Sequence, residues 1–199
     1  MRNATSYHVD DDRAILDDIH RTIVIHGAAT LAGLKVGSLF CYRGFVGPLL
    51  SHHLESTRRL LAERGVLLHV FRRCERGCQI YIYRPSMLRT LLDDDDVRAF
   101  LTSYGYDVDQ PTDALVRRLA ERFRSDRFPH ELGIFLGYPL HDVEGFIRHR
   151  GKNYLCAGCW KVYAERERAE AMFQKIKSCR ETLLDRYQSG APLRQLIAA

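Results

Sequence analysis

The chain has 199 residues, of which 46% are hydrophobic and 28% charged, with a formal net charge of +5. This length fits a single domain with a substantial core, and the composition is that of an ordinary globular protein. The apolar run at residues 23–34 contains His26 and is far shorter than the roughly 20 residues that a membrane span needs. Since no secretory signal is recognisable either, we expect a cytoplasmic protein with no membrane segment, whose six cysteines form no disulfide framework.

Hydrophobic periodicity predicts helices and strands along the chain. Two segments rich in β-branched and aromatic residues, 66–73 and 78–84, flank four residues that suit a hairpin loop. The four aspartates at 93–96 suit a helix start better than a metal site, because a helix N-terminus favours acids. The predicted helices are 10–26, 49–64, 86–92, 93–104, 112–123 and 165–187, and the predicted strands are 38–42, 66–73, 78–84 and 159–163.

Without its terminal helices, this order of elements is β-α-β-β-α-β. It predicts an α+β fold with an antiparallel sheet of about four strands and helices packed on it, in a ferredoxin-like arrangement with extra N- and C-terminal helices. We expect one domain over residues 1–199, with an N-terminal helix at 10–26, a core at 38–163 and a C-terminal helix at 165–187. Ferredoxin-like domains often associate through their sheets, so a homodimer is expected by analogy.

Residues 128–163 contain the highest density of specialised residues in the chain. Within them, Cys156 and Cys159 have the spacing of a redox dithiol or of half a metal site. Cys74 and Cys78 offer a second pair in the predicted hairpin, although with a different spacing. A redox motif would also precede a helix, whereas this pair enters a predicted strand. One hypothesis is therefore a shared metal site of four thiolates, and the other is unbridged cysteines.

The Pro-His-Glu sequence at 129–131 invites comparison with zinc proteases. Position 134 is an isoleucine, however, where the protease motif needs its second histidine. Glu131 suits a helix start, because acids are favoured there. His130 remains as a candidate ligand or acid–base group.

Residues 132–147 also look like a helix-turn-helix, with a Gly-Tyr-Pro turn between two short apolar helices. The second helix begins with His141-Asp142 and carries Glu144, whereas a recognition helix presents basic residues to phosphates. The pattern therefore does not favour nucleic-acid binding.

A basic loop, Gly151-Lys152-Asn153-Tyr154, follows three residues of the same character and suits a phosphate or a carboxylate. It is not a P-loop, and no GxGxxG follows a predicted strand. The segment TLAGLK at 30–35 has two readings that the sequence leaves open. Either its backbone amides and Lys35 close on the same anion, or it is only a tight connection from helix to strand.

These segments together resemble an uncharacterised family of bacterial proteins of about this length. The resemblance covers most of the chain and rests on TLAGLK at 30–35, FPHELGIFLGYP at 128–139 and GKNY with WKVY at 151–163. In that family the position of Cys159 is often aromatic, which counts against a site that needs all four cysteines. The resemblance implies a role in anaerobic metabolism, with a link to iron or flavodoxin-type electron transfer, and no established activity.

Our first hypothesis is a protein that binds an anionic small molecule or a metal or redox cofactor, and that works with a redox partner protein. A second hypothesis is an enzyme in which His130 or Tyr154 transfers a proton and lysines neutralise charge on an anionic substrate. A third is a nucleic-acid or protein interaction module that uses the basic residues near 150. The expected ligand-binding residues are Thr30, Lys35, Lys152, Asn153, Trp160 and Lys161, beside His130 and Tyr154.

Overall fold

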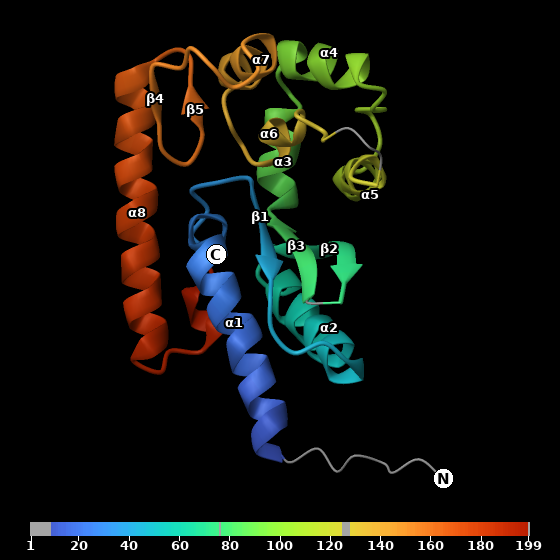
Figure 1. Ribbon diagram of the computed structural model, residues 1–199, viewed down its shortest axis with the longest axis vertical. Helices are drawn as coiled ribbons and strands as arrows, with labels where there is room; N and C mark the ends of the chain where they lie inside the picture. The colour runs from blue at the N-terminus through green and yellow to red at the C-terminus, as the bar shows by residue number, and fades with distance from the viewer. Residues whose placement is uncertain (1–8, 76, 125–127, 199) are drawn as a thin grey trace.

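A computed structural model describes residues 9–75, 77–124 and 128–198. A three-stranded sheet lies among the helices, and a separate two-stranded hairpin lies beside the N-terminal end of the long C-terminal helix (Figure 1). The predicted α+β class is thereby confirmed. The elements are α1 (Val9–Leu31), β1 (Gly37–Tyr42), α2 (Pro48–Ala62), β2 (Leu67–Cys74), β3 (Gly77–Tyr83), α3 (Pro85–Leu91), α4 (Asp95–Ser103), α5 (Thr112–Arg122), α6 (Leu132–Phe135), α7 (Leu140–Arg148), β4 (Cys156–Ala157), β5 (Lys161–Val162), α8 (Arg166–Gln188) and the 3₁₀ helix η1 (Leu193–Leu196).

The central sheet has the order β1-β3-β2 and is antiparallel throughout. Strands β1 and β2 are therefore parallel to each other, are joined by α2 and have β3 between them. This is the split β-α-β part of the predicted ferredoxin-like arrangement. The predicted fourth strand does not join this sheet, because its backbone bonds locally. Leu155 N donates to Val162 O at 2.8 Å and Gly158 N to Trp160 O at 3.0 Å, which closes the β4–β5 hairpin on itself.

The sheet is covered on both faces. Successive side chains of a strand point to opposite sides. In β3, Ile80 and Ile82 accordingly pack with α1, α2, α8 and η1, whereas Tyr81 and Tyr83 pack with the helices from α3 to α7. The apolar residues of β3 are therefore buried on both faces, and the strand reads as a continuous run of apolar and aromatic residues.

Helix α1 continues to Leu31, beyond its predicted end at residue 26. The small residues that resemble a loop in the sequence instead let the helix lie close to the sheet. A Cβ atom at Gly27 would lie only 2.4 Å from Cδ1 of Ile82. The absence of a side chain at this position therefore permits the close packing of helix on sheet.

The buried side chain of Arg84 closes the C-terminal end of α1. Its Nε donates to the carbonyl of Thr30 at 2.8 Å, and its Nη2 donates to those of Leu31 at 2.6 Å and Ala198 at 2.9 Å. The carbonyls of Thr30 and Leu31 have no partner within α1, and a positive charge at this end also complements the helix dipole. One guanidinium therefore joins the end of β3, the end of α1 and the C-terminal segment.

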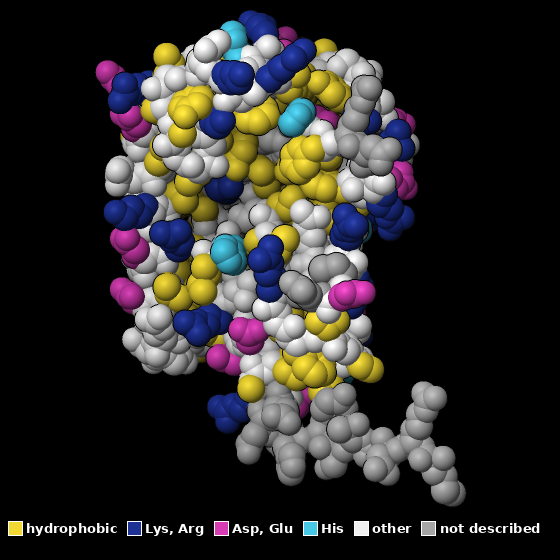
Figure 2. All heavy atoms as spheres, in the orientation of Figure 1, with side chains coloured by type: hydrophobic (Ala, Val, Ile, Leu, Met, Phe, Trp, Pro, Cys, Tyr) yellow, Lys and Arg dark blue, Asp and Glu magenta, His cyan; other side chains and the backbone are white. Residues whose placement is uncertain are grey.

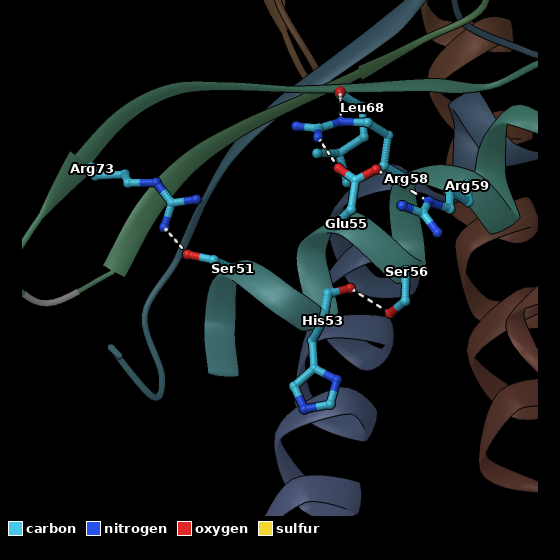
Figure 3. A network of polar contacts seen from close by, with 8 residues as sticks. All are labelled: Ser51, His53, Glu55, Ser56, Arg58, Arg59, Leu68 and Arg73. Carbon is cyan, nitrogen blue, oxygen red and sulfur yellow. Dashed lines mark hydrogen bonds and ion pairs between the residues drawn. The ribbon is translucent and has the colours of Figure 1, made fainter. Parts of the chain in front are cut away.

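Polar contacts fix α2 along β2 (Figure 3). Nε of Arg58 donates to the carbonyl of Leu68 at 3.1 Å, and both Arg58 and Arg59 form ion pairs with Glu55. Arg73 of β2 donates to the Ser51 hydroxyl at 3.2 Å. This places α2 on the sheet face opposite to α5.

Among the helices that the structure describes, none combines the length and the apolar character required to cross a lipid bilayer.

Candidate functional site

A cavity of about 500 Å³ lies between α7, the segment that leads through α6, and the β4–β5 hairpin. Figure 2 shows hydrophobic side chains gathered over this part of the molecule, with the surface hollowed between them. The basic side chains that line the cavity are those of His130 and Lys161, and the acidic one is that of Asp142. The apolar and aromatic side chains in the lining are Phe128, Leu132, Leu136, Tyr138, Val143, Phe146, Ala157 and Trp160.

The carboxylate of Asp142 joins α7 to the hairpin. It is 2% exposed. Its Oδ2 accepts a hydrogen bond from Nε1 of Trp160 at 2.7 Å, and its Oδ1 accepts from the backbone N–H of Tyr163 at 2.6 Å and of Ala164 at 3.2 Å. A buried carboxylate needs such donors, because burying an unpaired charge is costly. Asp142 is therefore a structural anchor for the cavity wall.

Aromatic rings build the wall that this anchor holds. Trp160 stacks on Tyr138 with ring centroids 5.0 Å apart and meets Phe173 of α8 edge-on at 4.5 Å. The Tyr138 hydroxyl donates to the carbonyl of Cys159 at 3.1 Å. Burial raises the pKa of Tyr138 to about 12, so the phenol is neutral at physiological pH. The wall is therefore flat, apolar and fixed from both sides.

Lys161 places a positive charge at the edge of the cavity. Its Nζ donates to the carbonyl of Gly151 at 2.6 Å and lies 4.8 Å from the ring centroid of Tyr154 and 5.8 Å from that of Phe146. Among the described residues, no carboxylate forms an ion pair with this ammonium group. Its charge is therefore available to an anionic ligand.

His130 and Glu131 point in different directions, as expected for neighbours in a helical turn. The exposed ring of His130 lies between Phe128 and Phe146, with centroids 5.5 and 5.3 Å away, at the cavity. Glu131 is fully buried, where it accepts from the Tyr106 hydroxyl at 3.0 Å and pairs with Arg122. Burial and the Glu131 charge raise the pKa of Tyr106 well above its usual range.

The 30–35 segment is a connection and not an anion loop. The amides of Leu34 and Lys35 both donate to the carbonyl of Ala29, at 2.8 and 3.1 Å, and Gly33 has a φ of +72°. This is the usual way in which a glycine ends a helix. These amides are thereby used within the chain, which rules out the reading in which they bind an anion.

Only some of the predicted site residues come together. His130, Trp160 and Lys161 line the cavity, and the half-exposed Tyr154 packs against Lys161. Lys35 lies on the other side of Tyr138, with its Nζ 5.0 Å from the ring centroid. Thr30, Lys152 and Asn153 also lie outside the cavity lining: Thr30 is buried against Ser38, and Lys152 and Asn153 are exposed in the basic loop.

The described residues do not gather into the predicted four-thiolate site. Cys78 is buried in the central sheet, whereas Cys156 and Cys159 belong to the separate hairpin. Among the described residues, no group of three or more histidine, cysteine or acidic side chains could hold a metal ion. The side chain of Cys74 lies outside the described residues. The two cysteine pairs belong to different sheets, and the described residues give no support to the metal prediction.

The sequence reasoning missed three residues of the cavity, Tyr138, Asp142 and Phe146. The helix-turn-helix comparison had treated Tyr138 as part of a turn and Asp142 as an unfavourable charge near DNA. A better signal was the isolated acid in the first turn of an apolar helix, shortly before the only tryptophan of the chain. A buried indole N–H needs an acceptor, and Asp142 provides it.

Fold and site together define an α+β protein with an aromatic-walled cavity under a short hairpin. The chain belongs to the family described as a protein of unknown function, DUF3793, whose model matches residues 23–197. This confirms the uncharacterised family that the motifs indicated. A search of curated proteins found no match, and neither did a search of solved structures.

Proposed function

We propose that this protein binds a small organic anion that carries a ring system, in the cavity between α7 and the β4–β5 hairpin. The observation that supports this most is the pairing of a flat aromatic wall with an ammonium group that has no acidic partner among the described residues. Small-molecule sites commonly combine a mostly apolar lining with a few polar groups that orient the ligand.

The size of the cavity supports a ligand of moderate size. With about 30 Å³ for each water-sized group, 500 Å³ accommodates about 17 non-hydrogen atoms. Ring systems fit such a wall well, because offset-stacked and edge-to-face contacts add to the burial of apolar surface. Trp160 and Phe146 offer these contacts from two different elements.

Lys161 and His130 favour a negative charge on the ligand. A hydrogen bond between an ammonium group and a carboxylate is stronger than one between neutral groups. Phe146 and Tyr154 hold the Lys161 ammonium group in place before a ligand arrives. The ligand that we propose therefore carries its carboxylate or phosphate at the hairpin edge and its rings against Trp160.

We also propose a cytoplasmic location. Cys41, Cys156, Cys159 and Cys179 are free thiols, as is usual for proteins in a reducing compartment. In that setting the ligand would be an intracellular metabolite or an organic redox cofactor. A cofactor of this kind would provide the link to electron transfer that the family resemblance implies.

Calorimetric titration with two matched probes tests the proposal. One probe is a naphthalene carboxylate and the other is the corresponding naphthalene methanol, which has the same rings and no charge. We expect the carboxylate to bind about tenfold more tightly, because a hydrogen bond to a charged group contributes roughly 1.5–3 kcal/mol and solvent at the cavity edge weakens it.

In a Lys161→Met variant the advantage of the carboxylate should disappear while binding of the alcohol persists. Lys152→Met is the matched control, since this exposed lysine of the 151–154 loop does not line the cavity. Equal affinities of the wild-type protein for both probes would contradict the role of Lys161, and no binding of either would overturn the proposal.

A further inference from the structure

A second cavity, of about 320 Å³, lies on the other side of the ring pair Tyr138 and Trp160, which also line the first cavity. It is bounded by α3, α4, α7 and α8, and Lys35 contributes its amine-bearing side chain. The lining combines charged and titratable side chains, which are Asp94, His141, Asp142, Glu165 and Arg168, with aliphatic ones. The aliphatic side chains are Leu34, Leu91, Val97, Leu140 and Met172.

The amine of Lys35 is held in this cavity by packing and not by an opposite charge. Gly137, with a φ of +76°, lets the two chain segments meet, since a Cβ atom there would lie 2.9 Å from Cγ2 of Val36. Nζ of Lys35 then lies 5.0 Å from the ring centroid of Tyr138. Among the described residues, no acid forms an ion pair with it.

Burial lowers the pKa of Lys35, and the nearby Cys159 only partly offsets this effect. The choice of lysine matters, because an arginine does not lose its proton in proteins whereas a buried lysine does. Only 5 of the 30 basic Lys and Arg residues in the chain are lysines. Position 35 thus offers an amine where most basic positions carry a guanidinium group.

We propose that Lys35 is a nucleophile that forms an imine with a small, mainly aliphatic aldehyde or ketone bound in the second cavity. Desolvated lysines next to apolar surface act in this way towards carbonyl compounds. At about 30 Å³ per water-sized group, the cavity holds roughly ten non-hydrogen atoms. The aliphatic side chains of the lining match the apolar body of such a molecule.

The chemical step needs no redox partner. The lone pair of the neutral Nζ attacks the carbonyl carbon, and the electrons of the C=O π bond move to oxygen, which takes up a proton. The nitrogen then releases both of its protons to solvent, and the oxygen takes up a second proton and leaves as water. A carbon–nitrogen double bond replaces the carbon–oxygen double bond. This site does not depend on the anion proposed for the first cavity, because Lys35 does not line that cavity.

Reductive trapping tests the proposal on the intact wild-type chain. The protein is incubated with hexanal and cyanoborohydride near neutral pH, and mass spectrometry of peptides follows each lysine. The exposed Lys152, Lys175 and Lys177 provide internal references. Because burial lowers the pKa of Lys35, a larger fraction of its amine is neutral near pH 7, and Lys35 should be labelled several-fold faster than these residues.

Raising the pH should reduce this advantage, because the exposed lysines then also lose their protons. Lys35→Met should abolish the fast label and leave the labelling of Lys152 unchanged, while circular dichroism checks that the variant is folded. If Lys35 reacts no faster than the exposed lysines at neutral pH, the proposal is overturned. The same conclusion holds if its rate advantage does not change with pH.

Discussion

The indole N–H of Trp160 donates a hydrogen bond of 2.7 Å to the carboxylate of Asp142. The two residues belong to different elements, since Asp142 lies in the first turn of α7 and Trp160 in the hairpin turn. The same carboxylate accepts from two backbone N–H groups at the end of the hairpin. One buried side chain therefore fixes both the strand and the ring that form the cavity wall.

Asp142→Asn should destabilise the protein by about 1.5–3 kcal/mol, because an amide replaces one acceptor oxygen by a donor and removes the charge that strengthens the bonds. Urea unfolding measures the loss. The emission of Trp160 should also shift to longer wavelength as the indole loses its anchor. Glu144→Gln on the exposed side of the same helix is the control and should change stability by no more than about 0.5 kcal/mol. Equal stability of the two variants would show that Asp142 does not anchor the hairpin.

Gly158→Ala should loosen the hairpin from α8. The added Cβ atom would lie 2.3 Å from the Phe173 ring, so the hairpin or the ring must move. Overpacking of this kind costs about 1–3 kcal/mol. Gly158→Ala should therefore cost less stability in a Phe173→Leu protein than in the wild-type protein. Thermal unfolding of the four proteins gives the coupling, and a coupling near zero would mean that the two sites do not meet.

Arg84→Met should lower the free energy of unfolding by about 2–4 kcal/mol. The variant keeps the aliphatic volume but removes the guanidinium hydrogen bonds to the carbonyls of Thr30, Leu31 and Ala198. Arg64→Met is the control, because Arg64 is exposed near the end of α2. Urea unfolding should separate the two variants clearly, and similar losses would argue against the capping role of Arg84.

The stability of the α1–α2 packing should depend on pH through His20, whose Nε2 lies 3.1 Å from Oγ1 of Thr57. Burial lowers the pKa of His20 from 6.5 to about 4, with Asp17 opposing and His53 adding to the effect. Between about pH 6.5 and pH 4, His20 is therefore protonated in the unfolded chain and neutral in the folded one. Stability should fall as the pH drops from about 6.5 to about 4, by up to about 3 kcal/mol, and this contribution should level off below.

In His20→Gln this part of the pH dependence should be absent, whereas His52→Gln, at an exposed position, should retain it. Urea unfolding at several pH values gives the comparison. The same pH profile in the wild-type and His20→Gln proteins would show that His20 titrates normally in the folded state.

Local patterns predicted many of the elements well. The β2–β3 hairpin pairs as expected from its β-branched and aromatic residues. Asp94 caps α4 by accepting from the backbone N–H groups of Asp96 and Val97 at 2.9 and 3.2 Å, which confirms that the aspartate run starts a helix. Both features depend on neighbours in sequence, and such interactions can be inferred from a single chain.

Features that depend on distant contacts could not be predicted in the same way. The end of α1 depends on the contact of Gly27 with Ile82 and on Arg84, which lies more than fifty residues further along. The separation of β4 and β5 from the main sheet depends likewise on Asp142 and Phe173. The sequence therefore predicted three residues of the candidate site, His130, Trp160 and Lys161. It did not predict Asp142, whose carboxylate holds the cavity wall in place.

The central claim is that a ring-bearing organic anion binds against Trp160. The chain has one tryptophan, so its proton–nitrogen NMR spectrum contains a single indole signal. Titration with the naphthalene carboxylate should shift this signal in a saturable way in the wild-type protein. Ala157→Phe should abolish the shift by filling the cavity, whereas Ala171→Phe, at an exposed position of α8 outside the cavity, should not. An indole signal that stays unmoved in the wild-type protein, or that moves equally in Ala157→Phe, would contradict the claim.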